Sequence, residues 1–286
     1  MPGARDGGIG VSRALLLTLA YAAGAALVVA LAAAVGWAAR DASFAAAFEA
    51  TRRDPLVVGL AQLVSAAIAI GLGVAVAFED TPYREALAIR PVGSAVAVLA
   101  VTAGLGLAFP LREVAVLAAD LAPAIAPDPA HALELARRLR IDGLVDALVI
   151  PLCLVAIPAL AEELLFRGLI QPGLGEKLGD RPALALTALL FGLVHLSPIA
   201  IVYATLAGLA LGWLRLRTGS VLPSIALHGA VNATPILLPA WLVRIEGFNT
   251  LDAEPTHLPL WLVLGGLLVA LGALWGAARL SALDEV

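Results

Sequence analysis

Residues 143–171 read GLVDALVIPLCLVAIPALAEELLFRGLIQ, an apolar run that is interrupted near its end by Glu162, Glu163 and Arg167. A helix needs about 20 mostly apolar residues to cross a bilayer, and this run is longer than that. A charged side chain at bilayer depth costs at least about 2.5–3.5 kcal/mol on insertion scales. The run therefore predicts a membrane helix whose charged residues face a partner or a water-filled cavity.

The composition of the whole chain extends this prediction to an all-α, polytopic membrane bundle. Of 286 residues, 61% are hydrophobic and 14% are charged, whereas soluble domains have about 45–50% apolar and about 25% charged residues. Period-two alternation is absent, which argues against a membrane β-barrel. Hydropathy predicts about eight spans, near residues 14–38, 56–78, 92–111, 143–171, 182–196, 198–214, 219–243 and 258–279.

No internal repeat or soluble segment is visible, so we expect residues 1–286 to form a single integral membrane domain. The first apolar run is longer than the roughly 7–15 residues of a signal peptide core, and we expect it to be a retained helix. Residues 130–141 alternate apolar and charged side chains with helical spacing. They predict either a short amphipathic helix on the membrane surface or a solvated loop helix.

Basic residues in the loops predict the orientation and the location of the chain. With a cytoplasmic N-terminus, nine basic residues fall in inside loops and seven in outside loops, by counting on the printed sequence. The short turns after the fourth and sixth spans are clearly basic, which favours cytoplasmic N- and C-termini. Lys177 is the one lysine among 18 basic residues, a coding bias that favours a bacterial cell membrane. The net charge of -4 gives no reason to expect a nucleic-acid partner.

Two further groups of polar residues lie in apolar surroundings. His195 ends the segment Phe191-Gly-Leu-Val-His195, and His228 and Asn232 are four residues apart in the predicted seventh span. A rise of about 1.5 Å per residue from the turns near 172–181 and 215–219 places Glu162, His195, His228 and Asn232 about 14–20 Å deep. We therefore expect these side chains to meet in one layer. The alternative is that each group is a hydrogen-bonding contact between helices.

Helical spacing also separates the two glutamates. Glu163 and Arg167 are four residues apart, so they are expected to pair on one face. Glu162 points about 100° away from Glu163 and is left free for another task. The lone Cys153 is interpreted as apolar filler rather than as a nucleophile. His131 and His257 are assigned to loops and given no role.

At these residues the chain resembles the CPBP family, which comprises type II CAAX prenyl endopeptidases and bacteriocin-processing enzymes. The family's motifs E-E-x-x-x-R, F-x-x-x-H and H-x-x-x-N (or H-x-x-x-D) appear in order, and the resemblance covers residues 143–245 as the catalytic core. It implies an eight-helix bundle around a water-accessible intramembrane cavity and cleavage of peptide bonds in membrane-associated proteins or peptides. Carried over by position, Glu162 and His195 activate water, His228 and Asn232 hold the oxyanion, and Glu163 and Arg167 support the site.

The residues themselves suit amide hydrolysis, which needs an activated water, a site for the oxyanion and a proton for the leaving amine. We expect Glu162 to act first as general base and then as general acid. A zinc site with Glu162, His195 and His228 as ligands is the alternative chemistry, but the sequence lacks H-E-x-x-H, and the metal-free mechanism is favoured. The alternative functions are a transporter and a non-catalytic scaffold.

Overall fold

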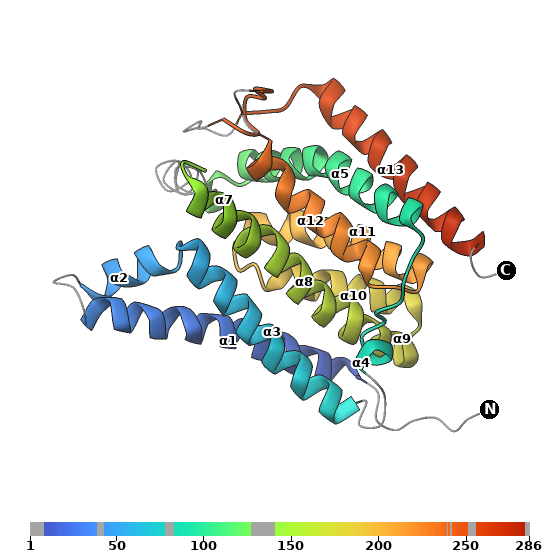
Figure 1. Ribbon diagram of the computed structural model, residues 1–286, viewed down its shortest axis with the longest axis horizontal. Helices are drawn as coiled ribbons and strands as arrows, with labels where there is room; N and C mark the ends of the chain where they lie inside the picture. The colour runs from blue at the N-terminus through green and yellow to red at the C-terminus, as the bar shows by residue number, and fades with distance from the viewer. Residues whose placement is uncertain are drawn as a thin grey trace.

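Helices account for the architecture of the described chain (Figure 1). The computed structural model describes residues 9–38, 43–77, 83–126, 141–238, 240, 242–250 and 256–283, and these residues contain no strand. The expected surface helix at 130–141 lies outside the described residues except for its last residue, and His131 lies outside them as well. The elements are α1 (Val11–Ala38), α2 (Phe44–Thr51), α3 (Pro55–Ala77), α4 (Tyr83–Ala86), α5 (Ser94–Leu121), η1 (Pro123–Ile125), α7 (Leu144–Pro151), η2 (Leu152–Ala156), α8 (Ile157–Glu163), η3 (Leu164–Ile170), α9 (Gln171–Leu178), α10 (Asp180–Leu193), α11 (Pro198–Thr218), α12 (Leu222–Leu237) and α13 (Leu260–Leu283).

The all-α membrane bundle is confirmed, but the count of about eight spans is not. Within the described residues, six helical runs are long and apolar enough to cross a bilayer: α1, α3, α5, the continuous run from α7 to α9, α11 and α13. The expected fifth and seventh spans correspond to α10, with 14 residues, and α12, with 16 residues. Both are shorter than the about 20 residues that a full crossing needs.

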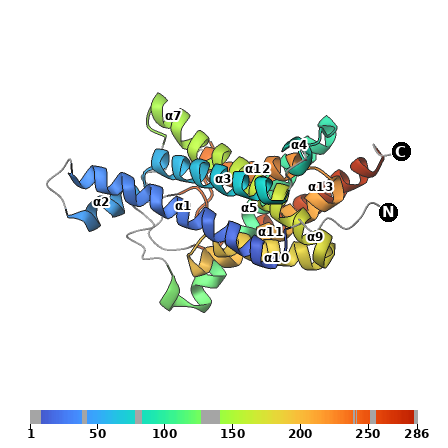
Figure 2. The ribbon, with the colours of Figure 1, turned by 90° about the horizontal axis from the view of Figure 1, so that it is seen from below.

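The run from α7 to α9 lies in the middle of the bundle, with helices packed on both sides of it (Figure 1). On one side α3 packs against η2, α8 and η3, and α1 lies along α3 (Figure 2). On the other side α12 packs against α8, α5 packs against α12, and α13 covers α5. The central run therefore contacts both halves of the bundle, and it carries the two glutamates.

Two π-helical segments, η2 and η3, bracket Glu162 and Glu163 in this run. Each of them ends two residues before a proline: Ala156 precedes Pro158, and Ile170 precedes Pro172. Proline has no N–H for the preceding turn and its ring crowds the carbonyl four residues back. A widened π-helical turn accommodates this defect without breaking the helix, and such turns occur frequently at functional sites.

The segment that leads into α13 is tied to α5 by His257. Its Nδ1 lies 2.6 Å from Glu113 Oε1 and its Nε2 lies 2.7 Å from Asp120 Oδ2. The next residue, Leu258, donates its backbone N–H to Glu113 Oε2 at 2.9 Å. Because both ring nitrogens face carboxylate oxygens, both must donate, and the imidazole is held as the cation. Hydrogen bonds to Glu113 and then Asp120 accordingly raise the pKa of His257 above its ordinary value of 6.5.

We expect this contact to make the stability of the protein depend on pH. A raised folded-state pKa means that the stabilisation is complete below the ordinary pKa of 6.5 and is lost as the pH rises through the higher folded value. Thermal unfolding in detergent, measured from about pH 5 to about pH 9, should give a difference between wild type and His257→Gln that is largest at the acidic end. A difference that grows toward alkaline pH would contradict the assignment.

Candidate active site

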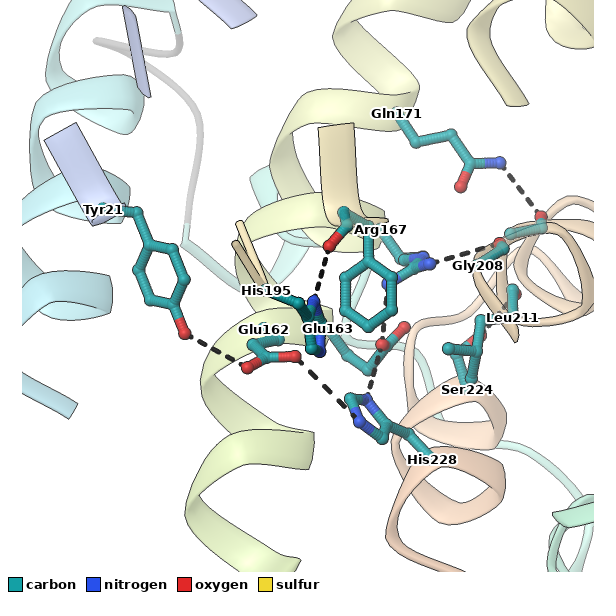
Figure 3. Close-up of polar contacts among 12 residues, drawn as sticks. Tyr21, Glu162, Glu163, Arg167, Gln171, His195, Gly208, Leu211, Ser224 and His228 are labelled. Carbon is teal, nitrogen blue, oxygen red and sulfur yellow. Dashed lines mark hydrogen bonds and ion pairs between the residues drawn. The ribbon is translucent and has the colours of Figure 1, made fainter. Parts of the chain in front are cut away.

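Glu162 lies near the end of α8, where its side chain is buried. Its Oε1 accepts hydrogen bonds from Tyr21 Oη at 3.2 Å and from Gln62 Nε2 at 3.3 Å. Its Oε2 has no hydrogen-bond partner within the described chain and lies 4.0 Å from His228 Nε2 (Figure 3). One carboxylate oxygen is thus held by protein donors, while the other faces an imidazole across a gap too wide for a direct hydrogen bond.

Glu163 and Arg167 form the ion pair that their spacing predicted. Arg167 Nη1 donates to Glu163 Oε1 at 2.8 Å, and both side chains are fully buried. Nη2 of the same guanidinium donates to the backbone carbonyl of Gly208 on α11 at 3.1 Å. The guanidinium also lies over the ring of Phe191, 4.2 Å from its centroid. Arg167 therefore joins three helical elements through one planar group.

His228 connects the two glutamates. Its Nδ1 lies 2.9 Å from Glu163 Oε1, whereas its Nε2 points toward Glu162 (Figure 3). A carboxylate only accepts hydrogen bonds, so Nδ1 carries a proton. Nε2 then holds a lone pair in the neutral ring and donates only when the ring is an imidazolium. The sequence prediction expected His228 to lie near Glu162, His195 and Asn232, and the contact with Glu163 was absent from it.

His195 lies just beyond the helix that was expected to contain it. The helix α10 ends at Leu193, and His195 belongs to the following turn, where Leu196 has a φ of 60°. Its Nδ1 donates to the backbone carbonyl of Phe191 at 2.9 Å, which leaves Nε2 with the lone pair in the neutral ring. Phe191 packs edge-on against His195 and His228, with centroids 5.1 and 5.7 Å away. The phenylalanine of the F-x-x-x-H motif therefore packs against both imidazoles of the site.

The four expected catalytic side chains share one cavity of about 1230 Å³. Glu162, His195, His228 and Asn232 all line it. Asn232 lies one turn beyond His228 on α12, is partly exposed, and has no hydrogen-bond partner within the described chain. The cavity extends from Glu162 to Arg244 and its neighbours in the segment after α12. Separate stretches of the sequence therefore bring their polar side chains to one cavity within the bundle.

These side chains do not converge as metal ligands do. Within the described residues, no three histidine, cysteine or acidic side chains lie in an arrangement that would hold a metal ion. Four-coordinate zinc requires ligand atoms within about 2.0–2.3 Å of one point, and the expected set of Glu162, His195 and His228 is not grouped in that way within the described residues.

Tyr21 and Gln62 are the site residues that the sequence prediction missed. They come from α1 and α3, which matched no motif. Each is a polar side chain in a largely apolar run, and a polar residue within a membrane helix usually faces a partner. That signal was present in the sequence. What was missing was the knowledge of which spans pack against the run that carries Glu162.

A comparison with protein families places the site in a known context. Residues 144–234 match the family model described as type II CAAX prenyl endopeptidase Rce1-like. The match contains both glutamates, Arg167, both cavity histidines and Asn232, and it confirms the resemblance that the three motifs indicated. No curated protein and no solved structure shows significant similarity to the chain. By its motifs and by this match, residues 144–234 of the chain are similar to the type II CAAX prenyl endopeptidase Rce1-like family.

Proposed function

We propose that this protein hydrolyses peptide bonds of membrane-associated proteins or peptides within its intramembrane cavity, with Glu162 as the proton-transferring residue. The observation that carries the proposal is the asymmetry of this carboxylate. Oε1 is held by two protein donors, whereas Oε2 is buried beside the Nε2 atom of His228 and has no hydrogen-bond partner among the described residues. A general base must have an oxygen free to accept a proton, and Oε2 meets that requirement.

The reaction follows from this arrangement. A water beside Oε2 gives one proton to Glu162 while its oxygen attacks the carbonyl carbon of the scissile bond. The tetrahedral intermediate then collapses, the C–N bond breaks, and Glu162 returns the proton to the leaving nitrogen. One proton is taken and one is given back, so the carboxylate is regenerated without a co-reactant. A group that takes and returns a proton in this way typically contributes 10²–10⁴-fold in rate, to order of magnitude.

His228 and Asn232 are proposed to stabilise the oxyanion. In this role His228 donates through Nε2 as an imidazolium while its Nδ1–H is held by Glu163 Oε1. Asn232 has a free carboxamide one turn further along the same cavity wall and supplies a second donor.

His195 is proposed to orient the attacking water. The hydrogen bond from Nδ1 to the carbonyl of Phe191 fixes the ring so that the Nε2 lone pair accepts from a donor in the cavity. Glu162 and His195 were expected to activate the water together, with His195 orienting it, and this assignment is kept. The imidazole that faces Glu162 in the bundle is that of His228.

We further propose a bacterial cell membrane as the location, with both termini in the cytoplasm. Two observations favour this orientation: the basic turns near 172–181 and 215–219, and the position of the start of α1 and the end of α13 on the same side of the bundle (Figure 1). In such a membrane the substrate is a peptide precursor, a sorting tag, a membrane-protein tail or a bacteriocin rather than a prenylated protein.

The test is cleavage by purified protein in liposomes. A prenylated CAAX peptide, the same peptide without its lipid, and a hydrophobic membrane-associated peptide are incubated with the protein, and new termini are identified by mass spectrometry. We expect cleavage at a defined bond in at least one of the three. A transporter or a scaffold would leave all three intact, and that result would overturn the proposal.

The zinc alternative is tested in the same samples. The glutamate mechanism predicts that activity persists after treatment with a chelator and that purified active protein contains well below one metal ion per chain. Stoichiometric zinc together with loss of cleavage on chelation, restored by adding zinc, would replace the metal-free mechanism by metal catalysis.

A further inference from the structure

We infer that Tyr21 and Gln62 are positioning residues for Glu162, so that the N-terminal helices complete an active site whose motifs all lie within residues 144–234. This inference rests on the proposed function of Glu162. It assigns a task to α1 and α3, which otherwise match the family only in being apolar. The two side chains act through the carboxylate and need not touch the substrate.

The contacts are specific and converge on one atom. Tyr21 is buried, and its hydroxyl donates to Glu162 Oε1 at 3.2 Å (Figure 3). The amide of Gln62 donates to the same oxygen at 3.3 Å. The ring of Tyr21 packs edge-on against Phe166, one turn after Glu162, with centroids 6.2 Å apart. The tyrosine ring is therefore held in place by the same helical run that carries Glu162.

Close packing of α3 on the central run brings Gln62 into reach. At Gly59, an added Cβ would lie 2.7 Å from Cys153 Cβ, and at Gly73 it would collide with Leu169. These two contacts lie on either side of Gln62 along α3. Small residues allow helix backbones to approach closely in membranes. Gln62 is thus held against the run at the level of Glu162.

The chemical consequence concerns which oxygen takes the proton. A carboxylate oxygen has two lone-pair sites, and the donors from Tyr21 and Gln62 occupy both sites on Oε1. The proton from water then goes to Oε2, the oxygen that faces His228 and the cavity. The two hydrogen bonds also prevent the carboxylate from rotating. Without them, Glu162 loses the orientation that in-line transfer requires.

The experiment compares Tyr21→Phe and Gln62→Met with matched variants on the same helices. Thr18→Val and Ser65→Ala remove buried hydroxyls of α1 and α3 that bond only to carbonyls of their own helix. We expect Tyr21→Phe and Gln62→Met each to lower kcat about tenfold, the equivalent of one hydrogen bond to a charged group. KM and the thermal midpoint should stay at the values of the matched variants.

The outcomes separate this inference from the function on which it rests. In one outcome, wild type cleaves the peptide and Glu162→Gln does not, so the proposed function stands. If Tyr21→Phe and Gln62→Met then have the same kcat as the matched variants on their helices, the positioning role is wrong. A fall in kcat that follows the thermal midpoint in all four variants would indicate a structural role and would also overturn it. If wild type cleaves nothing, the proposed function fails and the inference falls with it.

Discussion

Replacing Glu162 by glutamine is expected to lower peptide cleavage by at least about 10³-fold, because the variant cannot take a proton from water or return one to the leaving amine. Glutamine has nearly the same shape and keeps a carbonyl oxygen as acceptor for Tyr21 and Gln62. The fold should therefore be retained. The measurement is the initial rate of product formation in liposomes, with the thermal midpoint recorded for each preparation.

The matched control for this variant is Glu176→Gln. Glu176 lies on α9 with an exposed side chain, and the substitution removes the same charge outside the cavity. Its rate should equal that of wild type. If Glu162→Gln keeps more than about one tenth of the wild-type activity, the loss is too small for the sole proton-transfer group. The mechanism would then need another base.

The largest effect on stability is expected for Arg167→Met. Arg167 is fully buried and neutralises Glu163, and its removal leaves a buried carboxylate whose Oε2 already has no partner in the described chain. Breaking a buried ion pair by removing one partner costs about 3–5 kcal/mol in comparable proteins. The loss of the hydrogen bond to Gly208 and of the contact with Phe191 adds to it. Unfolding in detergent, by heat or by denaturant, measures the change.

Two further variants separate charge from packing. Arg52→Met removes an arginine from the exposed pair with Glu49, for which about 0–1 kcal/mol is expected. The double variant Glu163→Gln/Arg167→Met removes both buried charges and should recover part of the stability lost in Arg167→Met. If the double variant has a lower free energy of unfolding than Arg167→Met, the two buried charges do not compensate each other. Activity should stay low in the double variant because His228 loses its charged partner.

The comparison of prediction and structure is clearest in the central run. Its membrane character and the pairing of Glu163 with Arg167 could be predicted, because both depend on residues close together in the sequence. The π-helical turns could not, although Pro158 and Pro172 mark where each of them ends. Helix periodicity alone gives an average of 3.6 residues per turn and has no means of locating a wider turn.

The expected count of about eight spans is not confirmed for a related reason. Hydropathy counts apolar residues, and the segments that became α10 and α12 form helices of 14 and 16 residues, shorter than the run that a full crossing needs. Their ends at Leu193 and Leu237 are set by local geometry, including the positive φ of Leu196 after the turn with His195. An apolar run does not distinguish a helix that is buried in protein from one that spans lipid.

The sequence by itself determined that this chain is an all-helical membrane protein whose motifs resemble those of a protease family, because composition and short motifs are local properties that do not depend on packing. Only the tertiary structure decided the contacts within the site: that His228 joins the two glutamates, that His195 turns its Nδ1 to its own turn, and that Tyr21 and Gln62 hold Glu162. The physical reason is that hydrogen bonds between helices depend on which faces meet and at what level, and neither is encoded within any single helix.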